Sequence, residues 1–134
     1  MYMYSKGARS ERELIGIFAG KAFSVMRAAG SGVNSISPDI VAFKDGKGFL
    51  FECKAWSKGS LSINQEHMSV LRKWEKDTNM HAYIAWRIKG KGWFFIKLDE
   101  LSKSEKNFTI TMKTTFQIGR DINALLEGFD SGIH

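Results

Sequence analysis

An Asp-Gly pair between two apolar stretches constrains the fold of this chain more than any other feature. Residues 38–43 read Pro-Asp-Ile-Val-Ala-Phe, residues 48–54 read Gly-Phe-Leu-Phe-Glu-Cys-Lys, and Asp45-Gly46 lies midway between them. Asp-Gly between alternating apolar runs indicates a β-hairpin with a tight turn. A loop of even length centred on this pair sets Asp39 directly opposite Glu52.

Two acids and a lysine are expected on one face of this hairpin. Side chains alternate along a strand, so Glu52 and Lys54 share a face with Leu50, while Cys53 points the other way. Directly opposed carboxylates repel each other across a sheet. A divalent cation would remove the repulsion, and oxygen ligands suit Mg²⁺ or Mn²⁺. The alternative is a surface acid pair balanced by Lys54, with Asp39 acting as a turn residue.

The charge of the chain bears on its partners. Its 134 residues carry a net charge of +6 and a pI of about 9.5. This favours a polyanion, most commonly a polyphosphate backbone, with an acidic membrane surface as the rival. The length predicts one domain over residues 1–134. Because no apolar run approaches the ~18 residues of a spanning helix, we expect a soluble, cytoplasmic protein.

Cysteine and histidine patterns narrow the chemistry. A single cysteine rules out an internal disulfide and a cysteine-rich zinc site, and its position predicts a core role for Cys53. His67, His81 and His134 lack the spacing of metal ligands or of a Ser-His triad. The chemistry is therefore expected from carboxylates and lysine.

The first helix is expected to begin between Ser5 and Ser10 and to run to about Lys21. Glu11 lies on its apolar stripe and needs a partner there, which the metal patch or a nearby arginine would provide. Alternatively, Glu11 is simply an acid favourably placed near a helix N-terminus.

Further elements follow from periodicity and turn signals. Strands are expected at residues 23–27, 81–86 and 93–97, and a helix capped by Ser62 to Gln65 reaches about residue 77. The predicted order is α-β-β-β-α-β-β. In the tail, from residue 102 on, a strand at 108–112 and a short helix at 121–126 are expected, with no chemistry assigned.

A Gly- and Ser-rich loop spans residues 28–37. Its amides would approach a phosphate closely, and Ser31 between two glycines would hydrogen-bond one. A mobile connector is the alternative.

Together these residues resemble the archaeal Holliday junction resolvases of the Hjc type, in the restriction-endonuclease-like nuclease superfamily. The likeness covers about residues 6–101 and includes the Gly-Ala-Arg-Ser-Glu-Arg-Glu-Leu opening. Ala22 stands where relatives often have Gly. The residues that carry the likeness are, in order, Glu11, Arg27, Gly30-Ser31-Gly32, Pro38-Asp39, Glu52-Cys53-Lys54 and Trp93-Phe94-Phe95.

The resemblance implies roles for these residues. Glu11, Asp39 and Glu52 would bind the metal, Lys54 would orient water or stabilise the transition state, and Ser31 would be an active-site residue. The DNA-binding cations would be Arg12 and Arg27, which match basic positions of the family, together with Lys6, Arg9 and Lys58. The implied fold is a mixed central β-sheet flanked by helices, and family members act as homodimers.

The function expected from this resemblance is Mg²⁺-dependent hydrolysis of four-way DNA junctions by paired symmetric nicks, with no small-molecule cofactor. Alternatives are a repair or restriction-like endonuclease acting on duplex DNA, or a non-catalytic DNA-binding module. A pure binder gains nothing from acids facing a phosphate.

Apolar side chains also suggest a dimer surface. Large side chains are more numerous than one small core obviously needs, although all of them can lie inside the monomer. The candidates for this surface are Met68, Leu71, Trp74, Trp86, Trp93 and Phe95.

Overall fold

The computed structural model describes residues 2–28, 36–56 and 58–130, with side chains from Ala8 onward. A five-stranded sheet in the order β1-β2-β3-β5-β6 forms its centre, and a smaller sheet in the order β4-β8-β7 lies beside it. The strands are β1 (Ser24–Arg27), β2 (Ile40–Lys44), β3 (Lys47–Lys54), β4 (Ser60–Asn64), β5 (His81–Ile88), β6 (Gly92–Lys97), β7 (Ser102–Lys103) and β8 (Asn107–Thr111). The helices are α1 (Tyr2–Gly20), α2 (Gln65–Thr78), the 3₁₀ turn η1 (Leu98–Glu100), α3 (Met112–Ile118) and α4 (Ile122–Asp130).

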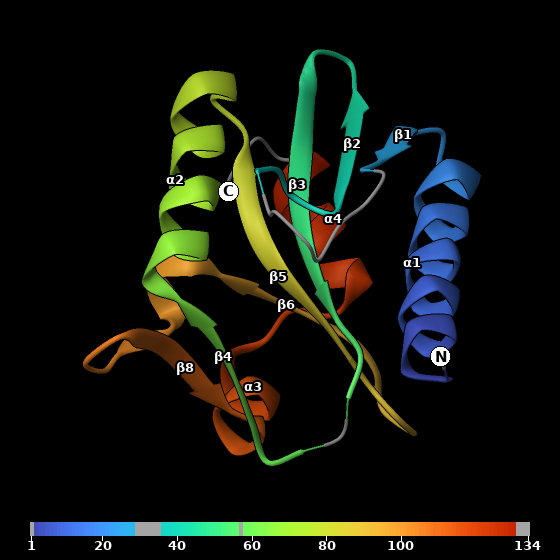
Figure 1. The fold of residues 1–134 in the computed structure, drawn as a ribbon. Coiled ribbons are helices and arrows are strands. Elements are labelled where there is room, and N and C mark those ends of the chain that lie inside the picture. Colours follow the sequence, from blue (N-terminus) through green and yellow to red (C-terminus); the bar gives the residue numbers. More distant parts are fainter. Residues whose placement is uncertain (1, 29–35, 57, 131–134) are drawn as a thin grey trace.

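Helices cover both faces of the central sheet, with α1 and α2 on opposite sides of the view in Figure 1. Strands β3 and β5 are parallel, whereas the other neighbours in this sheet are antiparallel. The predicted mixed sheet flanked by helices is therefore confirmed. Among the described helices, none is long and apolar enough to cross a membrane.

The central hairpin has the predicted register. Ile40 pairs with Phe51 and Lys44 with Lys47, so the pairing is symmetric about the turn. Asp45 and Gly46 have φ values of 55° and 76°, as a two-residue hairpin turn of the primed type requires. The alternation is also confirmed, because Phe49 and Phe51 face one core and Leu50 faces the other.

Helix α1 starts earlier than predicted, at Tyr2 rather than between Ser5 and Ser10. After its end, Ala22 adopts a left-handed φ of 70°. This conformation is easiest for glycine because it has no Cβ. The backbone therefore explains why a glycine suits this position.

Strand β4 was not predicted, and the expected cap within Ser62 to Gln65 is present but is made by Asn64, because Ser62 lies in the strand. Ser62 and Ile63 belong to β4, and Asn64 is the N-cap, its side chain accepting a hydrogen bond from His67 N at 2.7 Å. Strand β4 pairs with β8 in the tail. A pairing so distant in the sequence leaves little local signal.

The predicted tail elements are confirmed and extended. The strand expected at 108–112 corresponds to β8, and the helix expected at 121–126 lies within α4. Leu125 and Phe129 of α4 pack with Phe18 and Phe49 in the core on the α1 side of the sheet. The tail thus completes the hydrophobic core.

Most residues considered for a dimer surface are buried in the monomer. Trp86 and Phe95 are fully buried, and only Trp74 of the set is half-buried. The alternative, that these side chains fill the two cores of one chain, is correct for the other five: Met68, Leu71, Trp86, Trp93 and Phe95.

Candidate active site

Two buried carboxylates lie where β2 begins and β3 approaches its end. Asp39 is 7% exposed and Glu52 is 4% exposed. Asp39 N donates to the carbonyl of Phe51, which is already the ladder partner of Ile40, at 2.9 Å. Asp39 therefore lies beyond the last ladder pair, and the predicted direct pairing of Asp39 with Glu52 is not part of the ladder. Cys53 N donates to Asp39 Oδ2 at 2.9 Å. The hairpin backbone therefore fixes the Asp39 carboxylate beside β3.

Burial and like charge raise the pKa of Asp39 to about 7. Desolvation is the main cause, and the negative charge of Glu52 is the second; the Cys53 amide and the charge of Lys54 act in the opposite direction. An added cation would favour the ionised form of Asp39 and offset the charge of its neighbour.

The donor set of this site suits a divalent cation. Glu52 Oε1 is buried and faces His67 Nε2 at 3.1 Å, so it is an oxygen donor whose orientation is fixed by a neighbouring side chain. Asp39 supplies a second buried oxygen donor, and hard cations prefer such ligands. Within the described ranges, no group of three or more His, Cys, Asp or Glu side chains is placed to hold a metal ion, so the buried donors at this point are the two carboxylates.

Glu11 finds its partner in an arginine. Its Oε1 accepts a hydrogen bond from Arg27 Nε at 2.5 Å, and the Glu11 side chain is 12% exposed. Its negative charge still contributes to the raised pKa of Asp39, so it lies within electrostatic reach of the acids. Of the two partners considered from the sequence, the structure supplies the arginine.

Lys54 ends β3 on the same face as Glu52, two residues further along the strand. Its Nζ lies 5.5 Å from the centroid of the Trp56 ring. Its positive charge partly lowers the pKa of Asp39, which places the ammonium group near the acids. Glu11, Asp39, Glu52 and Lys54 are thus brought together by α1, the start of β2 and β3.

His67 is a neighbour of this site that the sequence did not indicate. Its Nε2 lies 3.1 Å from Glu52 Oε1 across the gap between α2 and β3. The Glu52 carboxylate raises the pKa of His67, whereas burial lowers it. The spacing of the histidines in the sequence could not indicate this contact, because His67 and Glu52 lie on different elements that meet only in the folded chain.

Cys53 lies against the core on the α1 side, as predicted. Burial raises the pKa of its thiol. This agrees with a packing role, since the thiolate is the nucleophilic form.

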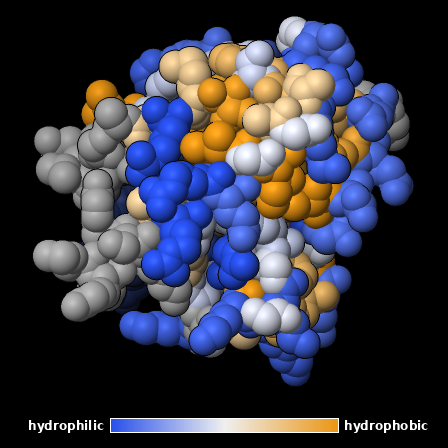
Figure 2. All heavy atoms as spheres, turned by 90° about the vertical axis from the view of Figure 1, so that its right-hand side faces the viewer, coloured by the Kyte–Doolittle hydropathy of each residue, from blue (hydrophilic) through white to orange (hydrophobic). Residues whose placement is uncertain are grey.

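The proposed DNA-binding cations that the structure describes are exposed. Arg9 and Arg12 are exposed on α1, and Lys58 is exposed before β4. Figure 2 views the molecule from the α1 side and shows hydrophilic side chains in a broad band next to an apolar area. Ser31 and the Lys6 side chain lie outside the described parts.

The sequence matches the family model described as "Archaeal holliday junction resolvase (hjc)" over residues 2–133. It is 31% identical to the crossover junction endodeoxyribonuclease Hjc of Archaeoglobus fulgidus over 121 residues, covering 90% of this chain and 88% of that protein. It is 34% identical to the protein of the same name from Methanocaldococcus jannaschii over 110 residues, covering 81% and 78%.

Solved structures are similar over nearly the whole chain. The Archaeoglobus fulgidus Hjc structure, described as a Holliday junction resolvase, superposes with a TM-score of 0.79 at 26% identity, covering 96% of this chain and 98% of that one. The bacterial homing endonuclease I-Ssp6803I superposes with a TM-score of 0.58 at 12% identity, covering 95% and 93%. The second likeness concerns the fold alone, which is of the restriction-endonuclease-like type.

Proposed function

This chain belongs to the archaeal Holliday junction resolvase family, and on that premise we propose that it cuts four-way DNA junctions at the site built on Asp39 and Glu52. The chain is an endodeoxyribonuclease by family.

The main support for this assignment is the buried pair of acids, Asp39 and Glu52. Burial and the negative charge of Glu52 raise the pKa of Asp39 to about 7. A fold has no structural need for two charges in such a place, whereas a nuclease needs ligands for a divalent cation. The pair therefore supports a metal-dependent nuclease centre over a DNA-binding module.

Asp39 and Glu52 would hold the cation, and Glu11, whose charge acts on Asp39, would join them directly or through water, as the family resemblance implies. We propose Mg²⁺, with Mn²⁺ as a substitute, because the donors are carboxylate oxygens. When bound, the cation would stabilise negative charge on the scissile phosphate and help to activate water.

Three further groups would take part in catalysis or position the metal ligands. Lys54, which shares the face of Glu52, would stabilise the charge that develops on the phosphate. The Cys53 amide holds Asp39 in place through its 2.9 Å hydrogen bond. Ser31 would act as an active-site residue, a role that rests on the family resemblance.

DNA would be held largely through its phosphates. Arg9, Arg12, Arg27 and Lys58 supply exposed cations, and Lys6 would add another. Because the substrate is DNA, the protein would work in the cytoplasm with the DNA.

A homodimer is the assembly we propose, since two equivalent cuts need two equivalent sites and a two-fold dimer supplies them. Its surface would include Ile36 and Trp74. Ile36 is 78% exposed, and its carbonyl accepts a hydrogen bond from Trp74 Nε1 at 2.9 Å. An exposed isoleucine held beside a half-buried tryptophan is typical of an interface core.

The direct test of this function compares two substrates. The protein and Mg²⁺ are incubated with a four-way junction and with a linear duplex of the same sequence. Junction-selective paired nicks at symmetric positions support the proposal. Equal cutting of plain duplex would favour a repair or restriction-like endonuclease instead.

A further inference from the structure

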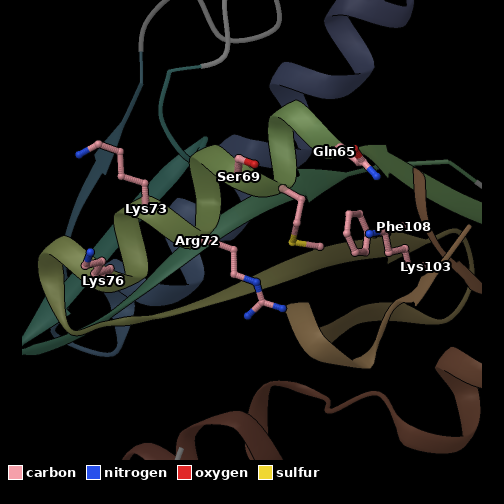
Figure 3. Close-up of a pocket in the computed structure, with 8 residues that line it drawn as sticks. Gln65, Ser69, Arg72, Lys73, Lys76, Lys103 and Phe108 are labelled. Atoms are coloured by element: carbon pink, nitrogen blue, oxygen red, sulfur yellow. The ribbon is translucent and has the colours of Figure 1, made fainter. Parts of the chain in front are cut away.

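A groove with several cations runs along the outer flank of α2, facing the β7–β8 hairpin. Its volume is about 570 Å³. Figure 3 shows the labelled side chains of α2 on one side and those of the hairpin on the other. We call it the α2–β8 groove; it is lined by Gln65, Met68, Ser69, Arg72, Lys73, Lys76, Lys103 and Phe108.

The groove lies on a different flank of α2 from the proposed active site. Gln65, Ser69, Arg72 and Lys76 recur at steps of four, three and four residues, so they share one flank of the helix. His67 is two residues from Gln65 and projects toward Glu52 instead. The same helix thus borders the acid site at its N-terminal turn and the groove along its length.

The lining is cationic and contains no acid. It contributes four positive side chains: Arg72, Lys73, Lys76 and Lys103. Two of these cations have acidic neighbours on the helix, Arg72 with Glu75 at 3.6 Å and Lys73 with Asp77 at 2.5 Å. Arg72, Lys73 and Asp77 are exposed, whereas Glu75 is half-buried and also accepts a hydrogen bond from Ala82 N. Ion pairs at an exposed surface contribute little, so both cations keep their attraction for a polyanion. Lys76 and Lys103 are exposed as well.

The floor of the groove is apolar. Met68 is buried and Phe108 is half-buried, while Gln65 and Ser69 offer hydrogen-bonding groups at the rim. Cations around an aromatic ring and an apolar floor suit a nucleic-acid strand, whose phosphates contact the cations and whose sugars or bases contact the ring.

We propose that the α2–β8 groove binds the backbone of a DNA arm outside the cleavage site. This inference rests on the proposed function, because it assumes a DNA substrate. From Gln65 to Lys76 the helix rises about 16 Å, at 1.5 Å per residue. Each strand of duplex advances about 3.4 Å per nucleotide, so the groove has the length of roughly five nucleotides. The junction would therefore be held at the acids and again along α2.

The test uses two double variants with equal loss of charge. The groove variant is Lys76→Ala with Lys103→Ala, both exposed residues outside the two ion pairs described above. The control is Lys21→Ala with Lys113→Ala, both exposed and not part of the groove lining. Junction affinity is measured for wild type and both variants between 50 and 300 mM salt, without divalent cation.

The groove variant should bind the junction roughly 30-fold more weakly at about 0.15 M salt, because each lost phosphate contact costs a factor of about 5. Its slope of log K against log salt should be shallower by about 1.8. The control should show less than half of each change. Cleavage at saturating DNA should equal that of the wild type, since neither lysine touches the acid site.

Equal binding by the two double variants would overturn the groove proposal, and so would a groove variant that binds like the wild type. Either result would leave the proposed function intact, because that is judged by junction cleavage in the wild type. Conversely, a wild type that binds but never cuts junctions would refute the proposed function while leaving the groove measurement valid.

Discussion

His67 on α2 lies 3.1 Å from Glu52 on β3, between the Nε2 and Oε1 atoms. The contact joins a helix on one face of the sheet to the acid that carries the proposed metal site. Asn64 caps the helix by accepting from His67 N at 2.7 Å, so the first turn of α2 holds the ring in place. His67 therefore belongs to the site as a positioning residue for Glu52.

Replacing His67 should slow cleavage. We expect His67→Ala to reduce the rate by roughly 10- to 100-fold, the range seen when groups around metal ligands are removed. His67→Gln should retain more activity, because an amide can still contact Glu52. Single-turnover rates on a junction and Mg²⁺ titrations of both variants measure the effect. Wild-type rates and metal affinity in His67→Ala would show that the contact is only structural.

Arg27→Ala should weaken DNA binding by a factor of about 5 at 0.15 M salt and make the salt slope shallower by about 0.9. The effect should be alike for different sequences, since phosphate contacts carry no base information. Arg27 is 37% exposed while paired with Glu11, so part of its side chain is accessible to solvent. Binding curves on two unrelated junction sequences test this, and a loss confined to one sequence would contradict it.

Ala22→Gly should stabilise the protein. Ala22 has a φ of 70°, where a Cβ costs about 1 to 2 kcal/mol. Glycine removes this strain but loses more entropy on folding, so we expect a net gain of about 0.5 to 1 kcal/mol. Urea unfolding measures it, with the exposed Ala19→Gly inside α1 as a control that should destabilise by a similar amount.

Glu100 should make the free energy of unfolding of the protein depend on pH in the acid range. Burial alone would raise its pKa, but hydrogen bonds from Arg120 and from the Lys97 amide lower it below the ordinary value. A depressed acid contributes stability above its unfolded pKa, and this contribution is lost as pH falls through the folded pKa. Glu100→Gln should therefore cost about 1 to 3 kcal/mol at pH 7 and progressively less below about pH 4.5. Unfolding free energies measured at several pH values check this; a pH-independent difference would contradict it.

Local sequence signals predicted the hairpin well. Asp45 and Gly46 enforce the turn, and alternation then assigns each β3 side chain to its face, so the position of Glu52 follows from neighbouring residues. Asp39 lies one residue before β2 and beyond the last ladder pair, where the turn register no longer applies. The sequence does not decide whether Glu11 contacts a metal or an arginine, because the apolar face of a helix does not show which residues pack against it.

Long-range contacts could not be predicted in the same way. Strand β4 exists because it pairs with β8, which lies more than 40 residues later in the chain. His67 meets Glu52 only once α2 packs on the sheet. Large apolar residues such as Trp86 do not reveal from sequence whether they fill a core or an interface. Each of these depends on how separate elements pack.

The central claim is that the buried Asp39 and Glu52 pair is the centre of a junction-cutting nuclease. The most direct measurement is cleavage and binding of one four-way junction by the wild type and by Glu52→Gln, each with Mg²⁺. We predict that the wild type makes paired nicks, while Glu52→Gln makes none but binds as tightly or slightly more tightly, because a negative charge has been removed. Cleavage at the wild-type rate by Glu52→Gln would contradict the claim.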